Sequence, residues 1–197
     1  MSRYSGQFIL KGGLLLYLIM NERARATKDI DLLAKETSAD LDVLRGIFAD
    51  ISAIPFEDAV IYDPGSVTAE KFEAMLYLAE INSRMKDFYD IYSLCISFDF
   101  DGRVLHQDVL QTILRRNTHT PKEPSVFDKN FANCKDKATQ WGAFRRRTSV
   151  GDSVDFSEVV CTISLFLKPV YKCIVNETYF LGYWEKNRRG WTIEPQK

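Results

Sequence analysis

Two carboxylates that could hold a metal stand close together in the segment DIDLLA, residues 29–34. If this segment is a strand, its side chains alternate between two faces, so Asp29 and Asp31 point to the same side. Their positions along such a strand are then about 7 Å apart. Carboxylates in this arrangement can hold magnesium ions that bridge a triphosphate. The same D-x-D spacing also occurs at the solvated ends of ordinary strands, so alone it indicates a metal site only weakly.

A pair of glycines lies upstream of these aspartates. Gly12 and Gly13 stand directly before the apolar run LLLYLIM, and glycines allow the backbone to turn tightly. Backbone N–H groups at the start of a helix can then approach phosphate oxygens closely. The glycine pair and the D-x-D pair together favour a nucleotide and metal site more strongly than either does alone.

A second group of charged residues follows between positions 71 and 90. Asp87 and Asp90 are three residues apart, so they share one face of a helix, and Arg84 and Lys86 are near enough to pair with them. The alternative is an intrahelical array of ion pairs, each worth a few tenths of a kcal/mol. Lys71 would ordinarily be a solvated helix lysine, because lysine is rarely buried without a partner. These residues therefore permit a site without requiring one.

The densest basic runs are Arg145–Arg147 and Arg115–Arg116. Clustered cations of this kind could contact an RNA backbone, although a charge run is more often a solvated face. The two histidines, His106 and His119, have no carboxylate or serine arrangement around them and are not assigned a role.

Composition sets wider limits. A chain of 197 residues with 46% hydrophobic residues can build one compact domain or two small ones. The net charge of -1 gives no overall attraction to nucleic acid or membrane. Four scattered cysteines without a C-x-x-C pair do not form a zinc pattern, and a reducing cytoplasm is the expected compartment. The longest apolar stretch, residues 14–20, is far shorter than the roughly 20 residues of a membrane span.

The first third of the chain predicts a small α+β part. The run FILKGGLLLYLIM, residues 8–20, predicts a helix with a glycine turn near its start, and residues 29–34 predict a strand. Residues 38–51 have apolar side chains at helical spacing after Ser38, a suitable N-cap. A short strand, residues 59–63, precedes the DPGS turn.

From residue 68 the pattern is mostly helical. Helices are predicted over residues 68–81, 83–96, 106–116, 138–147 and 154–175, the last kinked or ended near Lys168 by Pro169. The span from Asn117 to Asn133 predicts a loop with at most one short helix. Two short strands are predicted around Asn187 to Gly190. The predicted organisation is an α+β core over residues 1–67 and a helical region with a terminal hairpin over residues 68–197.

Three motifs in this order resemble the AbiEii/AbiGii toxin family of nucleotidyltransferases. They are K-G-G with a helix and RATKDIDLL, residues 11–33; AEKFEAM, residues 69–75; and NSRMKDFYDIYSL, residues 82–94. A looser resemblance extends through FDFDG, AFRRR and VDFSEVV, residues 98–160, so it covers most of the chain.

The resemblance implies a small nucleotidyltransferase-type mixed sheet with flanking helices, followed by a mostly helical part. It implies transfer of a nucleoside monophosphate from an NTP to an acceptor such as a tRNA, with magnesium, and a cognate antitoxin encoded nearby. On this basis Asp29 and Asp31 would bind the metal, and Lys71, Asp87 and Asp90 would be catalytic. The nucleotide would be bound by Gly12, Gly13, Lys71, Arg84 and Lys86.

The sequence departs from the family between the first two motifs. Relatives have further sheet strands there, whereas here only the span from Leu41 to Val67 intervenes, which indicates an internal deletion. The chain also begins within a few residues of K-G-G, where relatives usually have leading helices. Two hypotheses stay open: an active nucleotidyltransferase toxin, or a catalytically impaired, shortened remnant that binds nucleotide or protein.

Overall fold

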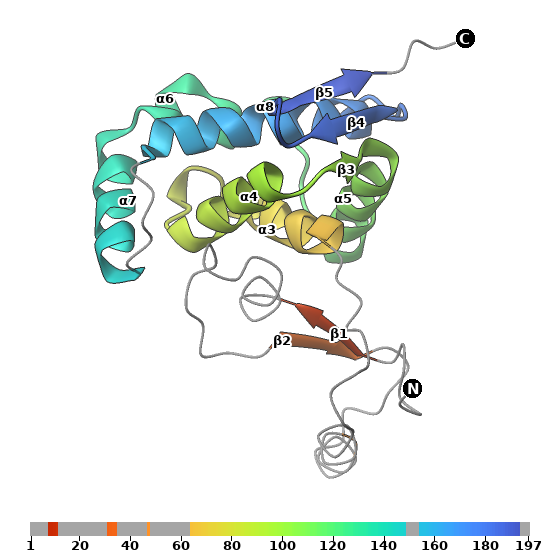
Figure 1. Cartoon of the computed structure of the whole chain (residues 1–197), viewed down its shortest axis with the longest axis horizontal. Coiled ribbons are helices and arrows are strands. Elements are labelled where there is room, and N and C mark those ends of the chain that lie inside the picture. Colours follow the sequence, from red (N-terminus) through yellow and green to blue (C-terminus); the bar gives the residue numbers. More distant parts are fainter. Residues whose placement is uncertain (1–7, 12–30, 35–46, 48–63, 149–153, 194–197) are drawn as a thin grey trace. The chain divides into compact units, whose positions relative to one another are not determined.

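A computed structural model describes residues 8–11, 31–34, 47, 64–148 and 154–193 (Figure 1). The chain divides into two compact units, Met1–Tyr62 and Asp63–Lys197. The first unit contains strands and the second is mostly helical, so the predicted α+β class is confirmed. In the described residues both sheets are antiparallel.

The first unit contains a pair of strands, β1 (Phe8–Lys11) and β2 (Asp31–Ala34). They pair antiparallel, with Lys11 opposite Asp31 and Phe8 opposite Ala34. The predicted strand is confirmed from Asp31 onward. The assignment of Phe8–Lys11 to a helix is wrong, because a short apolar run has no periodicity that separates a strand from a buried helix, and here it pairs with β2.

Several predictions for this unit lie outside the described residues. These are Gly12, Gly13, Asp29, the helix after the glycines and the strand over residues 59–63. Of the predicted helix over residues 38–51 the structure describes Ile47, which is helical and buried.

The second unit begins with α3 (Pro64–Leu78), which runs into a 3-10 turn, η2 (Ala79–Ile81). Next come α4 (Met85–Ser97), the short strand β3 (Phe100–Asp101) and α5 (Gly102–Arg116). The predicted loop contains two short helical segments rather than one, η3 (Ser125–Phe127) and α6 (Lys129–Ala132). The remaining elements are α7 (Lys135–Thr148), α8 (Phe156–Val175), β4 (Gly182–Glu185) and β5 (Gly190–Ile193).

Helix α8 packs against α4 and α5 and lies across them (Figure 1). It continues through Pro169 to Val175, so it does not end at the proline. Proline removes the hydrogen bond to the carbonyl four residues earlier, that of Leu165. Leu165 is exposed, so water can hydrate this carbonyl, while Phe166 and Val170 are fully buried on the opposite face. Their packing outweighs the cost of the proline.

The terminal hairpin covers one end of α8. Strands β4 and β5 form as predicted, and β4 also pairs with β3, which was not predicted because a two-residue strand has no detectable alternation. Trp184 of β4 is fully buried, and its ring centroid lies 4.8 Å from that of Phe166 and 5.5 Å from that of Trp191. The Trp184 Nε1–H donates to the carbonyl of Cys95 at 2.7 Å, which joins the hairpin to α4.

Gly102 marks a close approach between α5 and the hairpin. A Cβ atom there would lie 2.5 Å from the Gly182 carbonyl oxygen and 2.7 Å from the Phe180 ring. We expect Gly102→Ala to lower the free energy of unfolding by about 1–3 kcal/mol through overpacking. Gly142→Ala is the control, because its Cβ would meet only the Arg146 side chain, at 3.6 Å, and alanine favours the helix by about 0.5–1 kcal/mol. Urea unfolding followed by circular dichroism measures both; equal effects of the two variants would contradict the described packing.

Candidate functional site

The charged residues of the second and third motifs meet between α3 and α4. The Lys71 ammonium on α3 lies 3.2 Å from Oδ1 of Asp87 and 2.8 Å from Oδ2 of Asp90, both on α4. The side chains of the two aspartates are 1% and 2% exposed, and that of Lys71 is 11% exposed. Buried charges are costly unless they are paired, and here one cation satisfies two acids that share a helix face.

Arg84 adds a second cation to this group. Its Nε lies 2.8 Å from Oδ2 of Asp87, one turn along the helix. Its side chain is 48% exposed, so it reaches from the solvent to a buried acid. We call Lys71, Arg84, Asp87 and Asp90 the α3–α4 charge cluster. Two of its cation–acid contacts join residues 16 and 19 positions apart in sequence, which an intrahelical array of ion pairs does not do.

The environment of Lys71 keeps its ammonium charged. Burial lowers the pKa of Lys71, but the nearby Asp90 and Asp87 carboxylates raise it by more, so the pKa is above its ordinary value of 10.5. Because the pKa of Lys71 is higher in the folded than in the unfolded state, its ion pairs stabilise the fold fully at pH values below the unfolded pKa. This stabilisation is lost as pH rises through the folded pKa.

The direction of this pKa shift determines how stability depends on pH. We expect the difference in unfolding free energy between the wild type and Lys71→Met to stay constant from pH 6 to pH 9 and to shrink above about pH 10.5. Urea unfolding across this range measures it. If the difference in unfolding free energy already declined between pH 7 and pH 9, Lys71 would not be held charged by Asp87 and Asp90.

The turn before α4 is held by two polar residues that the sequence analysis did not select. The Asn82 Oδ1 accepts the Arg84 backbone N–H at 2.9 Å. The buried Lys137 ammonium on α7 donates to the Asn82 carbonyl at 2.6 Å and lies 5.2 Å from the Phe131 ring centroid. Asn82 has a sequence signal, since asparagine is common just before a helix. The sequence around Lys137 has none, because its role depends on the packing of α7.

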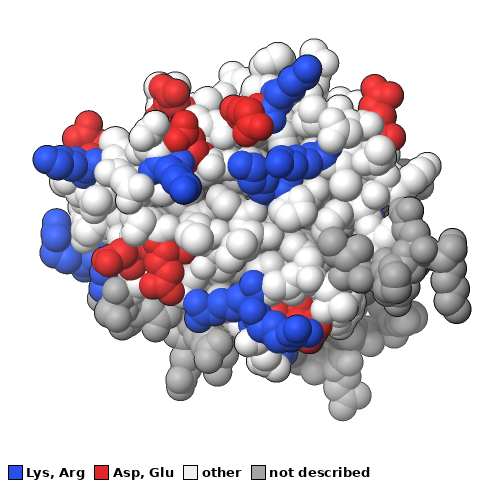
Figure 2. All heavy atoms as spheres, turned by 90° about the horizontal axis from the view of Figure 1, so that it is seen from above, with Lys and Arg blue, Asp and Glu red and all other residues white. Residues whose placement is uncertain are grey.

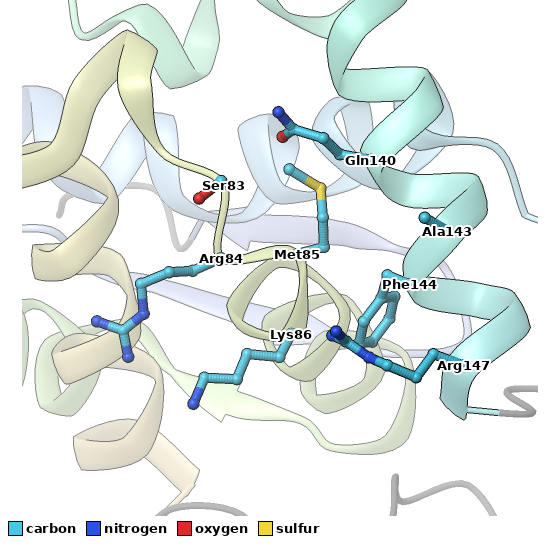
Figure 3. Close-up of a pocket in the computed structure, with 8 residues that line it drawn as sticks. All are labelled: Ser83, Arg84, Met85, Lys86, Gln140, Ala143, Phe144 and Arg147. Carbon is cyan, nitrogen blue, oxygen red and sulfur yellow. The ribbon is translucent and has the colours of Figure 1, made fainter.

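The predicted site residues thus fall into three groups. Lys71, Arg84, Asp87 and Asp90 lie together. Lys86 does not join them and lines a pocket between α4 and α7 instead (Figure 3). Of the other predicted site residues, Asp31 is the first residue of β2, whereas Gly12, Gly13 and Asp29 lie outside the described residues.

The charge cluster is suited to ion pairing rather than to a metal. Asp87 is compensated by Lys71 and Arg84, and Asp90 by Lys71. In the described part of the chain no three His, Cys, Asp or Glu side chains are grouped so that they could hold a metal ion. The D-x-D carboxylates, which the first motif points to, are oxygen ligands of the kind that magnesium prefers.

The basic runs have different environments. Arg115 pairs with Glu70 at 3.1 Å and Arg116 with the buried Glu73 at 2.5 Å. These two ion pairs join α5 to α3. They therefore do not offer free charge to an RNA. On the face shown in Figure 2 basic and acidic side chains are interspersed. In the last turn of α7, Arg147 lines the α4–α7 pocket and Arg145 a second pocket beside Trp141, while Arg146 is exposed and lines neither.

None of the helices described in the structure is both long and apolar enough to span a membrane.

Comparison with known proteins bears on the family. The family model for the nucleotidyl transferase AbiEii toxin of type IV toxin–antitoxin systems matches residues 1–68 and 59–160. The match falls in two parts that overlap over residues 59–68, which is consistent with a shortened family member. No curated protein and no solved structure matches the chain. Because these matches cover most of its length, the chain belongs to the AbiEii family of nucleotidyl transferase toxins.

Proposed function

We propose that this protein transfers a nucleoside monophosphate from an NTP to an acceptor RNA, such as a tRNA, and releases pyrophosphate. The observation that carries the proposal is the α3–α4 charge cluster. Two of the family's motifs, on separate helices, supply one largely buried lysine and two buried acids in direct contact. Such an arrangement is costly to bury and contributes little to a surface helix, whereas a transferase needs a fixed positive charge.

In this proposal Lys71 neutralises negative charge that develops on the phosphates during transfer. Asp87 and Asp90 hold its ammonium in one place and keep it charged, and Arg84 offsets the remaining charge of Asp87. A cation whose position is fixed before the reaction stabilises the transition state without reorganisation. Lys71 retains some exposure, so a phosphate oxygen can reach it from the open side of the cluster.

Asp29 and Asp31 are proposed to hold magnesium, and Gly12 and Gly13 to approach the triphosphate. Asp31 is the first residue of β2. The D-x-D pattern predicts that both acids lie near this end of the strand. When bound, magnesium would neutralise triphosphate oxygens. Arg84 is proposed to contact the NTP phosphates from the start of α4, where its outer part is accessible, and Lys86 is proposed to contact a nucleotide phosphate in the pocket that it lines.

Membership of a toxin–antitoxin family supports a further partner. We propose that a cognate antitoxin controls the activity, as the family's description implies.

A labelling assay tests the function. Purified protein is incubated with magnesium, each labelled NTP in turn and total RNA. We expect label on RNA with at least one NTP, and no label when magnesium is removed or when Asp29 and Asp31 are both alanine. If the folded wild type labels no RNA with any NTP, the transferase proposal is wrong and the binding remnant becomes the better account.

A further inference from the structure

A pocket lies beside the charge cluster, between the start of α4 and the last turns of α7. Its volume is about 480 Å³, within the usual range for ligand sites. Three cations line it, Arg84 and Lys86 at the start of α4 and Arg147 of α7, and none of its described lining residues is acidic. In Figure 3 the Arg147 side chain extends from α7 towards Lys86. The pocket therefore concentrates positive charge in a concave surface.

Two of these cations have no acidic partner among the residues that the structure describes. In the described residues neither Lys86 nor Arg147 forms an ion pair, whereas Arg84, Arg115 and Arg116 each pair with an acid. Electrostatic attraction to a ligand is strongest where nearby protein charges do not cancel it. Lys86 and Arg147 are therefore suited to an anion that enters from outside.

The pocket also contains an unused hydrogen-bond acceptor. Gln140 of α7 lines it, and its buried Oε1 has no donor in the part of the chain that the structure describes. In Figure 3 its side chain reaches from α7 over Met85 towards the start of α4. A buried acceptor without a donor costs about 1–3 kcal/mol, which a ligand that supplies an O–H or N–H group would recover.

We propose that this pocket takes one ribonucleotide of the acceptor RNA. Its phosphate lies against Lys86 and Arg147, and its ribose 2′-hydroxyl donates to the Gln140 Oε1 once that side chain rotates to bring the buried oxygen into the pocket. A ligand that carries both an anion and a donor fits the three residues, and a ribonucleotide within a chain carries both. The identity of the ligand as the acceptor rests on the proposed function.

The position of Arg84 supports an acceptor rather than a free NTP here. Arg84 lines the pocket and also pairs with Asp87, so a strand seated in the pocket runs beside the charge cluster. Lys86 also lines the pocket, and in the described residues it pairs with neither acid of the cluster. Single-stranded RNA bound by successive cations in this way needs neither magnesium nor NTP.

Binding of a fluorescent single-stranded RNA, measured by anisotropy without NTP and magnesium, tests the proposal. We expect Arg147→Gln to weaken binding about fivefold and to reduce the slope of log K against log salt by about 0.7. Arg146→Gln is the matched control, since it removes the same charge from the same helical turn outside the pocket. We expect it to change binding less than about twofold. Equal loss in the two variants, or no loss in Arg147→Gln, would overturn the proposal.

A second comparison tests the role of Gln140. The wild type is expected to bind RNA about fivefold more tightly than DNA of the same sequence, and Gln140→Leu is expected to lose this preference. If Gln140→Leu keeps the preference for RNA over DNA, the proposed contact with the 2′-hydroxyl is wrong. If Arg147→Gln binds NTP more weakly but RNA as tightly as the wild type, the pocket binds the free nucleotide instead. RNA binding without any RNA labelling would instead contradict the proposed function and leave the pocket intact. Circular dichroism confirms that each variant is folded.

Discussion

Lys71→Met should lower the free energy of unfolding by about 3–5 kcal/mol, because it leaves two buried carboxylates without their shared cation. It should also reduce RNA labelling by about 100- to 1000-fold, the usual cost of removing one fixed charge that stabilises a transition state. Urea unfolding measures the first effect and labelling below the unfolding transition measures the second.

A double variant separates these two effects. In Lys71→Met with Asp90→Asn, Asp90 no longer carries a charge and Asp87 keeps Arg84 as its partner at 2.8 Å. We expect this variant to regain a large part of the lost stability but none of the lost labelling. If labelling returned with stability, Lys71 would be a structural residue only, and the role proposed for it would be wrong.

Trp184→Ala should lower the free energy of unfolding by about 3–5 kcal/mol. The side chain is fully buried against Phe166 and Trp191, so its removal leaves a cavity between α8 and the hairpin. It also removes the hydrogen bond to the Cys95 carbonyl, which is left without its Trp184 donor. Thermal unfolding followed by near-UV circular dichroism measures the loss of stability and of aromatic packing.

The neighbouring strand residue provides the control. Tyr183 points to the opposite face of β4 and is 50% exposed, so Tyr183→Ala should change stability by less than about 1 kcal/mol. A loss of the same size in both variants would mean that the hairpin does not pack on α8 as described.

The long helices could be predicted from sequence because their apolar residues recur at helical spacing and their burial follows it. The predicted start of α5 at His106 was four residues too late, since the helix begins at Gly102. Asp101 caps it by accepting the Arg103 backbone N–H, and this local hydrogen bond extends the helix beyond its apolar stripe. The path of α8 through Pro169 could not be predicted, because it depends on which face of the helix is buried.

The candidate site was partly predictable for a similar reason. The spacing of Asp87 and Asp90 predicts that they share a helix face, and they do. That both meet Lys71 depends on how α3 packs against α4, which no local pattern encodes. The same holds for Lys137 and Gln140 of α7, whose partners lie on other elements or are absent from the described residues.

The charge cluster distinguishes the two hypotheses for this chain, an active transferase and a binding remnant. A remnant that only binds nucleotide or protein does not need the ammonium of Lys71 to be held by two buried acids. An active transferase does, because the cation must be in place before charge develops.

The most direct test of the central claim is a crystal structure of the protein with magnesium and a non-hydrolysable NTP analogue. The account predicts that the Lys71 ammonium contacts a phosphate oxygen of the analogue and that the carboxylates of Asp29 and Asp31 coordinate the magnesium beside it. A structure in which the analogue binds elsewhere, or in which Asp29 and Asp31 point away from the α3–α4 charge cluster, would contradict it.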